Sequence, residues 1–184
     1  GVPDLFNTGI RFSLKKLLRL GIIFMGIRMS IFSVAKIGAL AIGIVILCIS
    51  TGLLVTIFIT RKLKLSDKLG TLIAVGTGIC GVSAIAATAP AINAKDEEVA
   101  YAVSTITVFG MAALLVYPYL TYLVLRLSNV QAGIFMGTAI HDTAQATGAG
   151  MMYDQMWIVG EKIVSPTSMD VAVVTKLVRN TFMA

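Results

Sequence analysis

The chain has 184 residues, of which 57% are hydrophobic and 13% are charged, and its mean hydropathy is +0.91. A soluble domain carries about a quarter charged residues, because polar side chains must cover its surface. A disordered chain would need low hydrophobicity and high net charge, so that class is excluded as well. The composition predicts an all-α, polytopic integral membrane bundle.

Six stretches predict six membrane-crossing helices, which form a single transmembrane domain over residues 1–184. About 20 helical residues, each rising about 1.5 Å, cross a hydrocarbon core about 30 Å thick. The clearest stretch is 37–60, which carries no charge and is flanked by Lys36 and Arg61. The expected spans are 13–35, 37–60, 69–93, 98–126, 129–150 and 166–184.

Local signals place the helix ends and the loops. Ser128 and Gln131 form an expected capping box before the fifth span, and Ser165 is the expected N-cap of the sixth, with Pro166 at its first position. The turn 61–68 holds four basic residues and one acidic residue, whereas 95–98 holds one basic and three acidic residues. The positive-inside rule then puts the first turn in the cytoplasm and the second on the opposite side.

Small residues and a proline modify three of the spans. Gly110 and Pro118 predict a kink in the fourth span, and Gly133 and Gly137 share one face of the fifth, which favours close helix packing. In the third span, Gly76 begins a run of three glycines within six residues. Glycine costs about 1 kcal/mol in a helix interior, so this run predicts a broken helix. The residues that we assign to the break are Gly76, Gly78, Gly81 and Pro90.

A break inside a membrane is tolerated where its polar backbone groups are buried or line a wet cavity. The half-helix that begins near Ser83 would direct its free N–H groups at an anion. The expected ligand contacts here are Thr77, Gly78, Gly81 and Ser83. Glycines that serve only close helix packing remain an alternative. The same glycines match the dinucleotide pattern G-x-G-x-x-G with Asp96 at the ribose position, but Pro90 would interrupt the helix that this motif needs.

A second polar interruption covers residues 137–150 and contains His141, the chain's one histidine, next to Asp142. Ionisable groups at membrane depth are costly and are candidates for function. A histidine titrates near neutral pH, so His141 could couple proton movement to transport, with Asp142 as its partner or as a cation ligand. Helical spacing puts Gln145 on the face of His141. The alternative is a helix end at the interface, where both groups meet lipid headgroups.

Other kinds of chemistry lack their residues. One histidine and two separate cysteines, Cys48 and Cys80, provide no zinc-ligand set, and no nucleophile motif occurs, so we expect no metal, no cofactor and no enzymatic activity. Both cysteines fit small buried hydrophobic residues. The net charge of +6 comes from basic residues at the ends of apolar runs, which is a membrane pattern and not that of a nucleic-acid-binding protein.

The segments 76–92 and 133–145, together with 9–12, 17–22 and 175–180, resemble the YeiH-like family of bacterial inner-membrane proteins, commonly labelled sulfate exporters. The resemblance implies a relation to the sodium/proton antiporter and bile-acid symporter fold, with inverted repeats and crossed discontinuous helices. It also implies a considerably longer complete protein, of which this chain is a fragment.

These observations together predict a multi-pass protein of the inner (cell) membrane that exports a small anion such as sulfate by alternating access around the broken helix. The expected partners are the lipid bilayer, the anion and a coupling proton or sodium ion. Two alternatives remain. One is a sodium- or proton-coupled cation transporter in which Asp142 binds the ion, and the other is a membrane scaffold that transports nothing.

Overall fold

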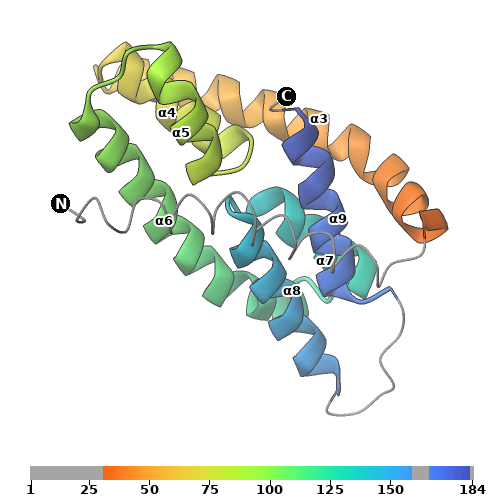
Figure 1. Ribbon diagram of the computed structural model, residues 1–184. Helices are drawn as coiled ribbons and strands as arrows, with labels where there is room; N and C mark the ends of the chain where they lie inside the picture. Colours follow the sequence, from red (N-terminus) through yellow and green to blue (C-terminus); the bar gives the residue numbers. More distant parts are fainter. Residues whose placement is uncertain (1–30, 159–165, 183–184) are drawn as a thin grey trace, which may run out of the picture. The chain divides into compact units, whose positions relative to one another are not determined.

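The computed structural model describes residues 31–158 and 166–182, and this part of the chain is helical without a strand (Figure 1). The all-α prediction is therefore confirmed for these residues. The chain divides into two compact units, 1–35 and 36–184, and the contacts below lie in the second. The elements are α3 (Ile31–Lys62), α4 (Asp67–Gly78), α5 (Val82–Ala91), α6 (Asp96–Tyr119), the π-helix η2 (Leu120–Val124), α7 (Asn129–Ala139), α8 (Thr143–Ile158) and α9 (Ser168–Thr181).

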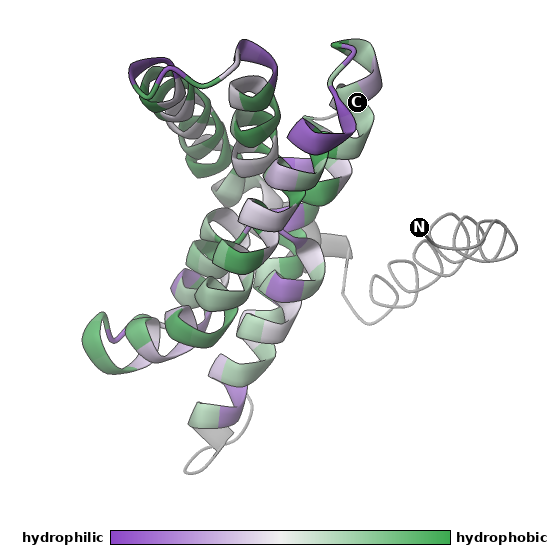
Figure 2. Cartoon of the chain, turned by 90° about the vertical axis from the view of Figure 1, so that its left-hand side faces the viewer, coloured by the Kyte–Doolittle hydropathy of each residue, from purple (hydrophilic) through white to green (hydrophobic). Residues whose placement is uncertain are grey.

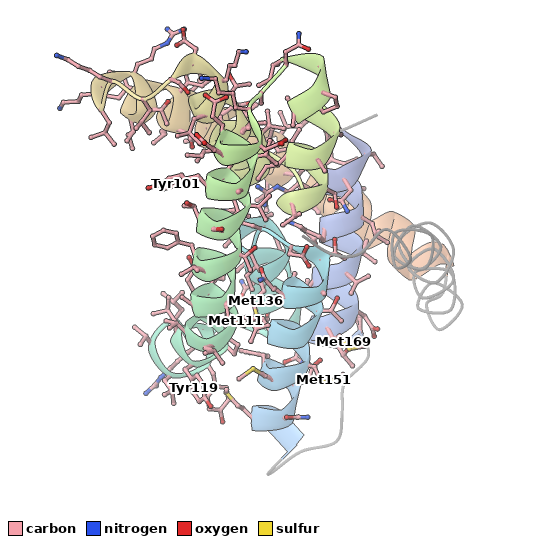
Figure 3. All side chains as sticks on the ribbon, turned by 60° about the vertical axis from the view of Figure 1, so that its left-hand side comes forward. Tyr101, Met111, Tyr119, Met136, Met151 and Met169 are labelled. Atoms are coloured by element: carbon pink, nitrogen blue, oxygen red, sulfur yellow. The ribbon has the colours of Figure 1, made fainter. Side chains whose placement is uncertain are left out.

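Two helices are long and apolar enough to cross a membrane, within Ala41–Lys62 and Asp96–Val124. Both leave large apolar side chains exposed, for example Phe58 on α3 and Val108 on α6. Tyr101 and Tyr119 of α6 also point away from the other helices (Figure 3). Of the expected spans, 13–35 lies almost entirely outside the described residues, and α3 begins at Ile31 and continues past the boundary expected near residue 36.

The stretch 69–93, expected as one crossing helix, is a hairpin made of α4 and α5. Lys68 Nζ donates a hydrogen bond to the Asn93 carbonyl at 2.6 Å, and Ser66 Oγ donates to Glu98 Oε1. The beginning of α4 and the end of α5 therefore lie together. The loops 61–68 and 95–98, expected on opposite sides of the membrane, are at the same end of the molecule, where hydrophilic residues gather (Figure 2).

The packing inside this first hairpin is antiparallel. Leu72 of α4 shares a buried cluster with Ile85 and Ala89 of α5, and α6 closes the cluster with Ala102 and Ile106. The chain reverses at 79–81, where Gly81 has φ +69°, a left-handed conformation that glycine adopts without steric cost. The fold-back depends on this turn, because it separates two short helices that then pack against each other.

A second hairpin, made of α7 and α8, replaces the expected helix 129–150. The Tyr153 hydroxyl of α8 donates to the Leu127 carbonyl just before α7, so the base of this hairpin lies at residues 127 and 153. The expected capping box of Ser128 and Gln131 is confirmed at the start of α7. The chain reverses at 140–142, between the end of α7 and the start of α8.

Helix α6 separates the bases of the two hairpins (Figure 1). It begins after α5 and leads through Pro118 into η2, where the hydrogen bonding shifts to the π pattern, and α7 follows. The hairpins consequently point toward each other and their tips touch. A Cβ built on Gly81 would lie 3.3 Å from the His141 carbonyl oxygen.

Helix α9 packs against both arms of the second hairpin. It begins at Ser168, later than expected, with Thr167 as N-cap, because the Thr167 side chain accepts from the Asp170 N–H. Asp154 of α8 also accepts from the backbone N–H groups of Ser168 and Met169, at 2.8 and 2.9 Å. The proposed cap Ser165 lies outside the described residues, and Pro166 precedes the helix.

Glycines allow α9 to approach α7 and α8 closely. A Cβ on Gly133 would lie 2.5 Å from Val171 Cβ, and one on Gly137 would lie 2.7 Å from the Ala172 carbonyl oxygen. The close packing predicted for these two glycines is confirmed. Gly150 of α8 makes the same kind of contact, since its Cβ would lie 2.6 Å from Met169 Cα.

We expect Gly150→Ala to lower the stability of the fold, because the added methyl group would overlap backbone atoms of α9 that cannot move without shifting the helix. Such overpacking costs about 1–3 kcal/mol. Gly43→Ala is the matched control, since nothing lies within 4 Å of a Cβ there. Thermal unfolding of both variants in detergent measures the difference, and equal melting temperatures would contradict the close approach of α8 and α9.

Candidate functional site

The two hairpin tips form the candidate site, because the ends of four helices meet there. Helices α4 and α7 end at Gly78 and Ala139, and helices α5 and α8 begin at Val82 and Thr143. The last four carbonyls of a helix have no partner within it, and neither have its first four N–H groups. Each tip therefore places acceptors from the end of one helix beside donors from the start of the next, and the turn backbone pairs some of them, such as the Gly81 N–H with the Gly76 carbonyl at 3.0 Å.

Arg179 of α9 satisfies carbonyls from both tips. Its Nε donates to the Gly78 carbonyl at 2.8 Å, and its two terminal nitrogens donate to the carbonyls of Thr77 and Thr138. The side chain is only 4% exposed. The planar guanidinium suits this task, since its donors point in several fixed directions at once.

Lys176, one helical turn earlier, makes a second bridge between the tips. Its Nζ donates to the Ile140 carbonyl at 2.6 Å and lies 3.4 Å from the Ile79 carbonyl. The side chain has no exposed surface. Both cations of α9 therefore lie at the negative ends of the helix dipoles of α4 and α7, where positive charge is stabilised.

Charged groups and helix ends are concentrated at the tips. Each helix end carries about half an elementary charge, and here two negative ends are offset by two positive ends. Asp142 is close enough to interact electrostatically with Lys176, and its Oδ1 accepts from the Ala144 N–H at 2.8 Å, which caps α8. The tips therefore combine the basic side chains of Lys176 and Arg179 with the carboxylate of Asp142.

The two helix beginnings differ. Asp142 caps α8, whereas α5 has no side-chain cap hydrogen bond at Gly81. Ser83 lies in the first turn of α5 and is exposed. The N-terminus of α5 is therefore the tip end at which backbone donors are presented without a capping carboxylate.

Two polar side chains near the tips have buried atoms without a hydrogen-bond partner among the described residues, His141 Nδ1 and Gln145 Oε1. Gln145 fits against α6 at Gly110, where an added Cβ would lie 2.1 Å from its Oε1. His141 lines a cavity of about 770 Å³ together with Thr77 and side chains of α3 and α6. An unpaired buried polar atom is costly, so these two atoms mark a place where a ligand or water would bind.

The structure brings most of the residues that we predicted for the site and the break to the hairpin tips, and Gly76 and Pro90 are the exceptions. Thr77 and Gly78 are at the end of α4, and Gly81 lies at the first tip against His141 of the second, where Asp142 is the next residue. Gln145 follows in the first turn of α8.

Two residues assigned to the break do not lie in it. Gly76 is inside α4, where a Cβ would meet Ile85 at 2.9 Å, and Pro90 is an exposed residue in the last turn of α5. A proline near the end of a short helix is tolerated because few hydrogen bonds follow it, so Pro90 does not mark the turn. Of the four assigned residues, Gly81 forms the turn and Gly78 ends α4.

The sequence analysis missed Lys176 and Arg179 as site residues. The available signal was a pair of cations three residues apart in the largely apolar stretch 171–179. In the residues that the structure describes, no group of three or more histidine, cysteine, aspartate or glutamate side chains is arranged to hold a metal ion.

Comparison with known proteins places the chain in a family. The model of the family described as conserved hypothetical protein 698 matches residues 1–184. The chain belongs to this family. Similar family members include the UPF0324 membrane protein SAG1125 of Streptococcus agalactiae, with 41% identity over 82% of the chain and 45% of the relative, and that of Fusobacterium nucleatum, FN0533, with 36% identity over 95% and 49%.

A third relative, the UPF0324 membrane protein spyM18_1033 of Streptococcus pyogenes, is 39% identical over 97% of the chain and 50% of its own length. The chain thus spans about half the length of these curated relatives. No solved structure matches. The names of the relatives and the apolar helices α3 and α6 identify this family member as a membrane protein.

We expect Arg179→Leu to destabilise this family member, because it leaves the carbonyls of Thr77, Gly78 and Thr138 without a donor. The loss of hydrogen bonds from a buried charged group predicts a cost of about 3 kcal/mol. Arg61→Leu at the exposed end of α3 is the matched control. Unfolding in detergent tests the expectation, and a melting temperature equal to that of the control would show that Arg179 does not hold the tips.

Proposed function

We propose that this chain is part of a secondary transporter, an exporter of a small anion such as sulfate, whose binding region is formed by the two hairpin tips. The observation that carries the proposal is the meeting of both tips around Lys176 and Arg179. The carbonyl ends of α4 and α7 already have donors there. The first turn of α5, which no carboxylate caps, then offers its backbone N–H groups and positive dipole end to an anion.

The proposal places the chain in the inner membrane as a multi-pass protein. Helices α3 and α6 cross the bilayer, and the hairpins enter it from opposite sides. A chain reversal at membrane depth is tolerated where the backbone is buried in protein or lines a wet cavity, which supports a site at Gly81 and His141. Hairpins of opposite direction on either side of α6 are compatible with inverted repeats.

Transport would require the tips to become accessible from each side in turn. His141 and Asp142 take part in this step as coupling or gating groups, since they form the turn of the second hairpin and face Gly81 of the first. The relatives are about twice as long as this chain, so the remainder of such a protein would form the opposing wall of the site.

The hairpin arrangement predicts which loops share a side of the membrane. In a full-length protein with Cys48 and Cys80 replaced by alanine, single cysteines at Lys62 and Asp96 should react with an impermeant maleimide from the same side. A cysteine at Leu125, beyond the other end of α6, should react from the opposite side. Labelling of positions 62 and 96 from opposite sides would show that 69–93 crosses the membrane.

The anion proposal is tested by flux of labelled sulfate into proteoliposomes that contain the full-length protein. We expect His141→Ala and Ser83→Ala each to reduce the flux by about tenfold, which corresponds to the loss of one hydrogen bond to a charged ligand. Ser104→Ala, an exposed serine on α6, is the matched control for Ser83.

The same preparation separates the alternatives. If neither sulfate nor related anions move under any ion gradient, the anion proposal fails. Sodium- or lithium-dependent proton release that is lost in Asp142→Asn would favour the cation transporter. A scaffold is favoured if changes at both tips leave every flux and every ligand-induced melting shift unaltered.

A further inference from the structure

The cavity beside the tips is large for an inorganic ion. Its volume is about 770 Å³, within the range of about 300–1,000 Å³ that small organic ligands occupy in proteins. Residues from α3, α4 and α6 line it, and the lining includes Thr77 at the first tip and His141 at the second. The cavity therefore adjoins the site proposed above.

The walls of this cavity are mainly apolar. Ile59, Ile106 and Phe109 are among the lining residues. Thr60 and Thr105 also line the cavity, but their hydroxyl groups do not offer free donors to a ligand. Thr60 Oγ1 donates to the Thr56 carbonyl at 2.9 Å, and Thr105 Oγ1 donates to the Tyr101 carbonyl at 2.9 Å. Each hydroxyl proton is thus used within its own helix. A fully hydrated anion would lose water on entering and find few replacements.

Two lining residues belong to the hairpin tips. His141 Nδ1 is buried without a hydrogen-bond partner in the described part of the chain. The backbone carbonyl of Thr77, another lining residue, accepts a hydrogen bond from Arg179, and the carbonyl of Ile140, next to His141, accepts from Lys176. The lining of an apolar cavity therefore includes an unpaired imidazole nitrogen, with the basic side chains of Lys176 and Arg179 bound to carbonyls next to it.

We propose that the substrate is an organic monoanion, a sulfonate or carboxylate whose charged group meets His141 while its apolar body fills the cavity. This inference rests on the proposed function and narrows its substrate class. A monoanion loses less hydration energy than a sulfate dianion when it enters apolar surroundings, so this cavity favours the monoanion. Apolar burial then adds to affinity in proportion to the length of the body.

The test uses the full-length protein in proteoliposomes, with methanesulfonate, pentanesulfonate and sulfate as competing and transported anions. Pentanesulfonate should bind more tightly than methanesulfonate in the wild type. Ala112 lines the cavity and is exposed, so Ala112→Trp fills space without overpacking the core. Ala100→Trp is the control on the same helix, at an exposed residue that does not line the cavity.

We expect Ala112→Trp to weaken pentanesulfonate binding by about tenfold, the equivalent of two methylene groups no longer buried, and methanesulfonate binding by less than about twofold. Ala100→Trp should change neither. A second variant, Phe109→Ala, removes a lining side chain and cannot fail through added bulk. Phe109→Ala should also weaken the binding of pentanesulfonate more than that of methanesulfonate. Phe58→Ala on the exposed face of α3 is its control.

The failures of the two proposals are distinguishable. If sulfate is transported and the sulfonates neither compete nor move, the organic-anion inference is wrong and the proposed function stands. If no anion moves, both fail. If Ala112→Trp and Phe109→Ala bind every anion as the wild type does, a lipid chain or the remainder of the longer protein occupies the cavity, and the inference is overturned.

Discussion

The described fold depends on how the carbonyl ends of two helices are satisfied where the chain reverses. Helices α4 and α7 stop at the tips, and their last carbonyls could not be left unpaired away from water without a large cost. Lys176 and Arg179 supply the donors from a single helix, one turn apart. The carbonyls of Gly78, Thr138 and Ile140 accept hydrogen bonds from side chains of α9, so both tips depend on that helix.

That dependence makes the position of α9 a constraint on the whole arrangement. The cations reach the tips because Gly133, Gly137 and Gly150 let the helix approach α7 and α8 to backbone distance. Asp154 and the Thr167 cap fix its beginning. A methyl group at one of these glycines would therefore disturb more than local packing. It would shift α9 and so move Lys176 and Arg179 away from the carbonyls of the tips.

The sequence predicts the helical class, and α3 and α6 are among its six expected spans, because both follow from composition; the break that it predicts from Gly76 to Pro90 includes Gly81, where the chain turns. It does not predict that 69–93 folds back. The apolar pattern of α4 and α5 is the same for one helix that crosses the membrane and for two that fold back. Contacts between distant residues, such as Lys68 with Asn93, 25 residues apart, determine which of the two forms. The charges of the loops suggested opposite sides, but acidic residues contribute little to the positive-inside rule.

Most of the predicted site residues lie at the tips, whereas the two basic residues of α9 were missed for a related reason. The rule that an ionisable residue at membrane depth is a functional candidate was applied to His141 and Asp142, whereas Lys176 and Arg179 were part of a closing span with basic residues near its end. The helix dipole provides the missing step. A break at Gly81 creates a negative helix end at Gly78, and such an end, buried away from water, requires a cation from elsewhere in the chain. Two breaks require such a donor twice, and a pair of cations one turn apart in an apolar helix meets that requirement.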